Sequence, residues 1–449
     1  MKKILTSKIV LLVLAISSIT LFNSCDKDKC KGVTCPAGQI CQEGECIGNP
    51  SGEGEEQVSG FITTNTTWTA DKIWILNGRV VVRSGATLTI EKGTLVKGAN
   101  GSGTSASVLI VERGAKINAV GTADEPIIFT SVDDNITFGE KAGTNLTEVD
   151  NELWGGLIIL GNAKVSTADG DTQGQIEGIP SNETYGVYGG SNDADNSGRL
   201  EYISIRHGGI TIGDGNEING LTLGGVGNGT TIENVEVVAN LDDGIEFFGG
   251  SVDVTNAIVV YQGDDGIDID QNYSGTVNNV MVITGDGIGT DEALEIDGPE
   301  GSTYTGGKFT ISNGTFITEG TEGSGADLKA KAQGNITLCS WEGFSKFVKV
   351  RASFSDTLLC TAKDDSYVYM TQTSPNLTIF NSEIVSTGSL TDLANAYNGS
   401  GGNCLGASEE ADLDMAISGS SNAVVGAATK GADKTKFANW TWASIKNKL

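Results

Sequence analysis

A short pattern occurs three times between residues 240 and 298, and it restricts the possible folds more than any other feature of the chain. The copies are Asp242–Phe248, Asp264–Asp270 and Asp291–Asp297. The second copy begins 22 residues after the first, and the third begins 27 residues after the second. Each copy joins acidic residues to a short run in which apolar residues alternate with polar ones. This recurrence predicts a parallel β-solenoid, in which one repeat forms one coil.

The alternation within each copy predicts the direction of its side chains. Ile267 and Ile269 share one phase and are expected to point inward, whereas Glu246, Asp268 and Glu295 occupy the other phase and point outward. In stacked coils such residues lie about 4.8 Å apart, and like charges on neighbouring strands repel each other. A bound cation would offset this repulsion. Protonation of the carboxyl groups and screening by solvent are the alternatives.

Calcium is the cation that we predict here, because it takes about 6–8 oxygen ligands and tolerates irregular geometry. Nothing in the sequence predicts an organic cofactor. The residues predicted as calcium ligands are Asp242, Asp243, Glu246, Asp264, Asp265, Asp268, Asp270, Asp291, Glu292, Glu295 and Asp297.

Charge and composition exclude some classes of partner and agree with a solenoid. The net charge of −28 excludes nucleic acid as a partner, because phosphate binding needs clustered Lys and Arg. The 449 residues exceed an ordinary single core, but a solenoid lengthens without thickening its core. The 63 glycines with only 6 prolines indicate many tight turns.

The N-terminus predicts export and a lipid anchor. Residues 1–24 have the charged start and the apolar run of a signal peptide. Leu21–Cys25 then resembles a lipoprotein box, so we expect Cys25 to carry acyl chains that hold the protein on a membrane. Asp26–Lys29 partly resembles the surface-export signal of Bacteroidetes lipoproteins. These features predict an outer-membrane lipoprotein that is exposed at the cell surface. An ordinary signal cleaved nearby and an uncleaved anchor are the alternatives.

Residues 25–47 contain a small cysteine-rich module, and residues 48–57 form an acidic, glycine-rich linker. In an exported chain the four cysteines predict two disulfides of open connectivity. Zinc is the alternative, although paired Cys-x2-Cys spacings are missing. The module resembles EGF-like domains. Its cysteines are Cys30, Cys35, Cys41 and Cys46.

The remainder is divided into a solenoid over residues 58–405 and a C-terminal tail over residues 406–449. Phe437, Trp440 and Trp442 are expected to cover the open end of the solenoid. Short helices are expected at Asp392–Tyr397 and Ala438–Lys448.

Three further cysteines lie in the C-terminal half. Cys339 and Cys360 are 21 residues apart, about one coil, and are therefore predicted to form a disulfide. Cys404 remains as a free thiol or as an alternative partner.

A polar, glycine-rich side loop is predicted over Ala168–Ser197. Tyr185 and Tyr188 in this loop are candidates for stacking on sugar rings. The alternative, which we favour, is that the loop covers a coil.

Several stretches of the chain resemble one superfamily. They are Gly85–Thr94, Trp154–Gly161, Asn219–Val226 and Asp242–Gly250, together with the tail around Trp442. They are similar to the right-handed parallel β-helix of the pectin-lyase-like superfamily, and more closely to a group of Bacteroidetes surface lipoproteins. The resemblance implies an all-β, right-handed parallel β-helix preceded by the small disulfide-rich module.

A second resemblance is to polygalacturonases. Asn240–Asp242 and Gly263–Asp265 are similar to the two segments that carry the catalytic aspartates of that family, so Asp242, Asp264 and Asp265 are the candidate catalytic residues. The Gly-His-Gly and Arg-x-Lys coils of the family are missing, and no Lys or Arg occurs between Arg206 and Lys308. A polyuronate site needs cations to neutralise the carboxylates of its substrate, and a lyase needs a basic group to remove a proton. The missing Lys and Arg therefore argue against both activities.

Three functions therefore stand at the level of the sequence. The leading one is a lipid-anchored, non-enzymatic surface protein that binds a glycan or another surface protein. The second is a carbohydrate-active enzyme, either a hydrolase or a lyase, that uses the repeated carboxylates. The third is a structural protein of the surface layer.

Overall fold

The computed structural model describes most of the chain from residue 54 onward, and before it only the backbone of a hairpin. The described ranges are 39–42, 45–48, 54–212, 217–321, 323–356, 358–385, 394–399, 404–406, 412–413, 416–417, 421–424 and 428–449. The predictions for the signal peptide, Cys25, Cys30 and Cys35 lie outside these residues. In the hairpin, β1 (Gln39–Gln42) pairs with β2 (Glu45–Gly48) so that Cys41 lies opposite Cys46. The side chains of these two cysteines also lie outside the description.

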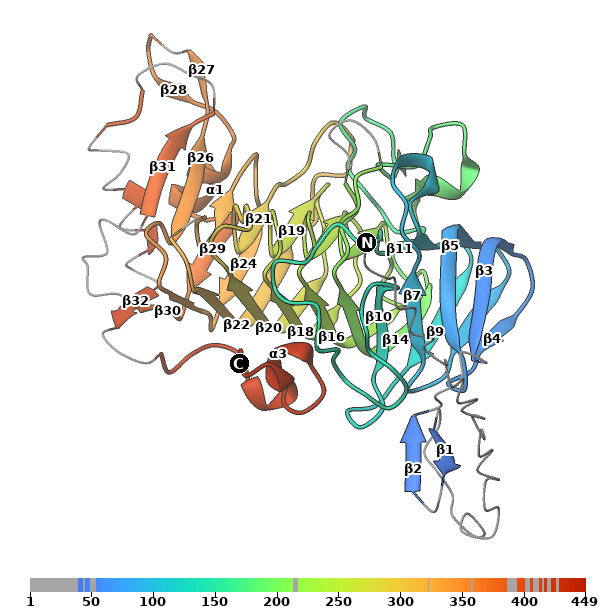
Figure 1. The fold of residues 1–449 in the computed structure, drawn as a ribbon. Coiled ribbons are helices and arrows are strands. Elements are labelled where there is room, and N and C mark those ends of the chain that lie inside the picture. Colours follow the sequence, from blue (N-terminus) through green and yellow to red (C-terminus); the bar gives the residue numbers. More distant parts are fainter. Residues whose placement is uncertain are drawn as a thin grey trace, which may run out of the picture.

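The body is a parallel β-helix built from one 26-stranded sheet, in which every recorded strand pairing is parallel (Figure 1). Each coil crosses three faces in turn, because strands of successive coils pair with one another. This confirms an all-β solenoid. The part of the chain that the structure describes contains no helix long and apolar enough to cross a membrane.

The first face carries the repeated acidic pattern. Its strands are β8 (Val108–Val111), β11 (Leu157–Leu160), β15 (Leu221–Gly224), β17 (Ile245–Phe248), β19 (Ile267–Asp270), β21 (Leu294–Ile296), β23 (Asp327–Leu328), β26 (Val348–Ala352) and β31 (Ala394–Asn398).

The second face holds shorter strands at both ends of the solenoid. They are β4 (Thr66–Trp68), β6 (Thr87–Ile90), β9 (Lys116–Val120), β24 (Gly334–Thr337) and β29 (Leu377–Phe380). The third face holds β7 (Leu95–Gly98), β10 (Ile127–Ser131), β25 (Ser340–Glu342), β30 (Ser382–Val385) and β32 (Ser421–Val424).

Long strands run from one face to the next. In the middle of the solenoid, five of them bend from the second face into the third: β14 (Gly198–Arg206), β16 (Thr231–Val238), β18 (Val254–Val260), β20 (Thr276–Thr284) and β22 (Phe309–Thr318). At the N-terminal end, β3 (Glu55–Ile62) and β5 (Ile73–Val82) bend from the third face into the first.

Asparagines form the corner between the second and third faces. Asn234, Asn256, Asn279 and Asn313 have φ of 57°, 57°, 58° and 54°, a region that Asn adopts more readily than most residues. Asn256 Nδ2 donates to Asn234 Oδ1 at 3.0 Å, and Asn279 Nδ2 donates to Asn256 Oδ1 at 2.7 Å. This asparagine ladder fixes the bend in successive coils. The sequence analysis missed it, although the 22-residue step from Asn234 to Asn256 repeats the coil period.

The predicted direction of the side chains is confirmed. Ile267 and Ile269 are completely buried inside the solenoid, as are the corresponding residues of the other repeats. Glu246 lies opposite Asp268, and Asp268 lies opposite Glu295, in parallel register. The repeats therefore place their acidic residues in one column on the first face.

The C-terminal segment does not cover the open end of the solenoid, and that prediction is wrong. The segment contains η4 (Lys434–Lys436) and α3 (Trp442–Ile445), and it lies along the side of the middle coils (Figure 1). Phe437, Trp440 and Trp442 pack against outward-facing apolar side chains of the third face. Those side chains are Val238, Ile258, Val260, Met281 and Ile283. A patch of this kind needs a cover.

The other boundary predictions need correction as well. The helix expected at Asp392–Tyr397 is wrong, because β31 forms there and pairs with β26. The helix expected at Ala438–Lys448 is confirmed only as the short α3. Sheet strands begin at Glu55, and β32 pairs with β30 inside the segment that was predicted as tail.

The predicted disulfide between Cys339 and Cys360 is wrong. Cys360 pairs with Cys404, with their Cα atoms 5.2 Å apart, and Cys339 is a buried free thiol. Cys360 belongs to a hairpin outside the coil, formed by β27 (Phe354–Asp356) and β28 (Thr361–Ala362). The residue that actually stacks on Cys339 is Ser382, whose Oγ accepts the Cys339 N–H at 3.2 Å.

Minor elements complete the description. They are α1 (Ser366–Thr371), η1 (Gly103–Ser105), η2 (Thr184–Gly186), β12 (Gly174–Gln175) and β13 (Val187–Tyr188).

Candidate functional site

A column of polar side chains runs along the outer side of the first face. Strand pairing places these residues opposite one another in successive coils, and their order is Thr222, Glu246, Asp268, Glu295, Asp327, Lys349 and Asn395. The column is acidic in its centre and basic toward its C-terminal end.

A second column lies in the turns that precede these strands, and it has a structural role. Asp243 Oδ1 accepts the N–H of Asp265 at 2.9 Å, and Asp265 Oδ1 accepts the N–H of Glu292 at 2.7 Å. Ser324 Oγ donates to Glu292 Oε1 at 3.1 Å. These carboxylates therefore link each turn to the next coil.

The carboxylates of the two columns gather into three groups that could hold a metal ion. Within each group, one oxygen of every residue lies within 4.8 Å of the others. The groups are Asp242–Asp243–Asp264, Asp243–Glu246–Asp268, and Asp265–Glu292–Glu295. Of the predicted calcium ligands, Asp270, Asp291 and Asp297 belong to no such group in the described residues.

Lysines from later coils neutralise the third group, and the sequence analysis missed them. Lys329 Nζ pairs with Glu295 and lies 3.8 Å from Asp297. Lys349 Nζ pairs with Glu292 and lies 3.0 Å from Asp327. Because residues 207–307 contain no Lys or Arg, the sequence predicted a face without basic side chains. The signal that could have found these lysines is the alternation of Asp327–Lys329 and Val348–Arg351, which continues the coil pattern.

The second group, Asp243–Glu246–Asp268, has no such partner. Nowhere in the described part of the chain does a Lys, Arg or His lie within ion-pair distance of these three carboxylates. Asp268 is only 8% exposed, and its Oδ1 has no hydrogen-bond partner. Asn219 Nδ2 donates to Glu246, which leaves Asn219 Oδ1 buried and unpartnered beside the group. These oxygens are the ligand type that calcium takes, so the group fits a calcium ion.

The electrostatics of this group follow from burial and from mutual repulsion. Burial first, and neighbouring carboxylates second, raise the pKa values of Asp243, Glu246 and Asp268 well above their ordinary range. The same causes raise the pKa of Asp242 to about 7, and burial with Asp291 and Glu295 raises that of Asp264 to about 6. Without a cation the protein holds protons here instead.

The candidate catalytic residues lie close together. The nearest oxygens of Asp242 and Asp264 are within 4.8 Å of each other. Asp265 Oδ1 is already engaged by the Glu292 N–H.

The side loop of residues 168–197 covers a coil, which is the alternative that the sequence analysis favoured. Tyr185 and Tyr188 are only 5% and 3% exposed, so their rings are not presented for stacking on a sugar. They pack with outward-facing apolar residues of the first face, such as Ile110 and Ile158. Here the outer column is apolar and requires a cover, which explains why the loop folds down.

The same loop forms one wall of a polar cleft of about 560 Å³. Gln271, which directly follows β19, and Glu300 also line the cleft, and Tyr188 Oη donates to Gln271 Oε1 at 3.0 Å. The cleft therefore lies at the end of the strand that carries Asp268. Its lining contains amides and carboxylates but no Lys or Arg, so it suits neutral hydroxylated ligands or cations.

The three faces of each coil and the stacked column of carboxylates define the class of the protein as a parallel β-helix. Residues 60–442 match the family model described as a pectate-lyase-like β-helix domain, and the chain belongs to that family. No significant match was found among curated proteins or among solved structures.

Proposed function

We propose that this protein is a lipid-anchored surface β-helix that binds a glycan along its first face without cleaving it, and that it uses calcium to do so. The observation that carries the proposal is the buried group Asp243–Glu246–Asp268, which lacks a cation and retains unpartnered oxygen atoms. The polar cleft beside Gln271, at the end of the strand that carries Asp268, supplies room for a sugar on the same face.

Calcium would be held by Asp243, Glu246 and Asp268, with Asn219 Oδ1 as a further ligand. When bound, the ion supplies positive charge that the face otherwise lacks at this point. Carboxylates of the face then accept hydrogen bonds from sugar hydroxyl groups, and amides of the face donate to them or accept from them. The proposed lipid anchor rests on the sequence motif that ends at Cys25.

A binding role is supported over an enzymatic one by the state of the nearby lysines. Burial lowers the pKa of Lys329 and Lys349, but bonds to Glu295, Glu292 and Asp327 outweigh this, and both pKa values are raised. Both side chains therefore remain protonated at neutral pH and are poor general bases for a lyase.

The proposal is tested by incubating the full chain, purified in detergent, with an array of immobilised polysaccharides in calcium or in chelator. We expect at least one polysaccharide on the array to retain the protein. The amount of retained protein should fall at least about tenfold in chelator, and equally in the double variant Glu246→Gln, Asp268→Asn. A matched control is Glu233→Gln with Asp124→Asn, because both residues are exposed and lie away from the first face. Retention that ignores calcium and the double variant would refute the calcium site.

The same incubations distinguish binding from catalysis and test the anchor. New reducing ends or unsaturated products would make the protein an enzyme, whereas failure to retain any glycan would leave a structural surface role. Changing Cys25 to Ala is expected to abolish labelling by a fatty-acid analogue and to release the protein from membranes. Labelling that persists would place the anchor elsewhere.

A further inference from the structure

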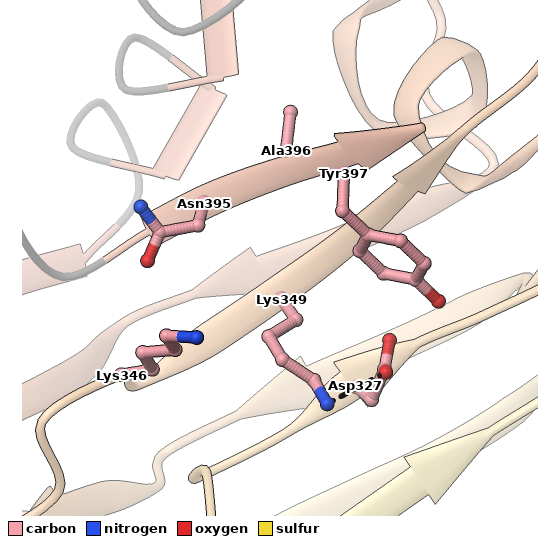
Figure 2. Close-up of a pocket in the computed structure, with 6 residues that line it drawn as sticks. All are labelled: Asp327, Lys346, Lys349, Asn395, Ala396 and Tyr397. Atoms are coloured by element: carbon pink, nitrogen blue, oxygen red, sulfur yellow. Dashed lines mark ion pairs between the residues drawn. The ribbon is translucent and has the colours of Figure 1, made fainter. Parts of the chain in front are cut away.

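A separate cleft of about 310 Å³ lies on the first face, toward the C-terminal end of the solenoid. Three neighbouring strands build it, because Asp327 of β23, Lys349 of β26 and Asn395 of β31 are in register. Lys346 and Tyr397 complete the polar lining (Figure 2). Its volume is sufficient for one sugar ring, at the lower limit of ligand pockets of about 300–1,000 Å³.

The charges of this cleft are incompletely balanced. Lys349 is engaged by Glu292 and by Asp327 Oδ2, the latter at 3.0 Å. Asp327 is only 6% exposed, and its Oδ1 has no hydrogen-bond partner. Lys346 is exposed, and within the described part of the chain its ammonium group has no carboxylate in ion-pair distance. The cleft thus presents a buried acceptor and a free cation.

The remaining residues add an apolar surface and further hydrogen-bonding groups. Figure 2 shows Lys346 and Asn395 on one side, the Tyr397 ring above Asp327 on the other, and Lys349 between them with its ammonium group beside Asp327. Burial first, and then the charge of Asp327 and a hydrogen bond to it, raise the pKa of Tyr397, so its hydroxyl group stays neutral and is directed at the Asp327 carboxylate. An aromatic ring beside polar groups suits the mixed surface of a sugar.

We propose that this cleft binds one acidic monosaccharide unit, that is, a hydroxylated ring with a carboxylate or sulfate group. The acidic group pairs with Lys346, and ring hydroxyl groups donate to Asp327 Oδ1. Such donors offset the penalty of leaving a buried acceptor without a partner, about 1–3 kcal/mol. This inference rests on the proposed glycan-binding function and assigns the charge class of the glycan. It involves neither Asp268 nor the calcium group.

The test is calorimetric titration of the full chain in detergent with glucuronate, N-acetylglucosamine 6-sulfate and glucose. We expect at least one acidic sugar to bind and glucose to bind much more weakly. Lys346→Ala should weaken the Kd for the acidic sugar about tenfold, the effect of losing one charge-assisted hydrogen bond. The affinity should also fall as salt is raised. Whichever acid binds identifies the carboxylate or the sulfate as the source of the charge.

Lys116→Ala is the matched control, because Lys116 is an exposed lysine on β9, on the second face. Asp327→Asn retains the shape of the cleft and should weaken the binding of whichever acidic sugar is bound by the wild type. The inference is overturned if no acidic sugar binds, if glucose binds equally well, or if Lys346→Ala behaves like Lys116→Ala. If the array still shows calcium-dependent retention in that event, the proposed function stands and only the assignment of this cleft fails.

Discussion

Glu236 is the residue whose substitution should destabilise the protein most directly. It is completely buried on β16, together with Arg206 of the neighbouring coil, and the Arg206 Nη2 atom lies 3.7 Å from Glu236 Oε2. Ser204 Oγ donates to Glu236 at 2.6 Å. The N–H groups of Trp442 and Ala443, at the start of α3, donate to the two carboxylate oxygens at 2.8 and 2.9 Å.

Glu236→Gln should lower the free energy of unfolding by about 3–5 kcal/mol. Removing one partner of a buried ion pair leaves an uncompensated charge, which costs about this much. Arg206 Nη1 and Nη2 have no hydrogen-bond partner, so the charge of Glu236 is their main compensation. The amide of Gln retains only one oxygen, so one of the two α3 N–H groups also loses its acceptor.

The measurement is denaturant unfolding followed by tryptophan fluorescence, with Glu233→Gln as the control on the same strand. Glu233 is exposed, and its substitution should change the free energy by less than about 0.5 kcal/mol. Adding Arg206→Met to Glu236→Gln should recover part of the loss, since it removes the uncompensated charge. A loss below about 1 kcal/mol for Glu236→Gln, or no recovery in the double variant, would refute this reasoning.

Three further predictions concern the carboxylate groups and the cysteines. Calcium at 100 times its Kd should stabilise the folded state by about 2.7 kcal/mol, and Glu246→Gln with Asp268→Asn should abolish this shift in calorimetry; a wild type indifferent to calcium would contradict the site. In chelator, the free energy of unfolding should fall as pH rises from about 4 to 8. The folded-state pKa values of Asp242 (about 7) and Asp270 (about 8) lie above their unfolded values, so the folded state binds more protons in this range. Unfolding curves at several pH values check the sign. Cys339 should react with iodoacetamide only after denaturation, and peptide mapping of the native protein that finds it alkylated would contradict its burial.

The regular repeats made the fold and the centre of the site predictable from sequence. In Asp242–Asp270 the pattern recurs after 22 residues and the alternation is strict, so residue number alone gave the correct register of Glu246 and Asp268. Inward burial of Ile267 and Ile269 follows from the same two facts.

The lysines of the face were not predictable in this way. The coil that contains Lys329 begins after an insertion near residues 298–308, so Asp327 follows its register partner Glu295 by 32 residues, although Lys349 then follows Asp327 by the regular 22. Irregular spacing of this kind hides the register, because a strand of two or three residues carries little alternation. Cys360 misled for a related reason: its separation from Cys339 equals one coil, yet the intervening chain leaves the coil as a hairpin.

The position of the C-terminal segment was hidden for a different physical reason. Its partners, such as Val238 and Met281, lie about 150 to 200 residues away in sequence. Strands that are apolar on both sides read as buried, but nothing local says which distant segment covers them. Only the three-dimensional structure shows that the C-terminal segment covers these strands.

The placement of this segment has a consequence for how the protein folds during its synthesis. The coils of β16, β18 and β20 are synthesised long before residues 437–442, so their outer apolar surface stays uncovered until those residues follow. A chain that lacks residues 437–442 would keep all the described sheet strands and still expose an apolar patch on the third face. A chain that stops before residue 437 should therefore leave this surface uncovered, even though every strand beneath it is complete.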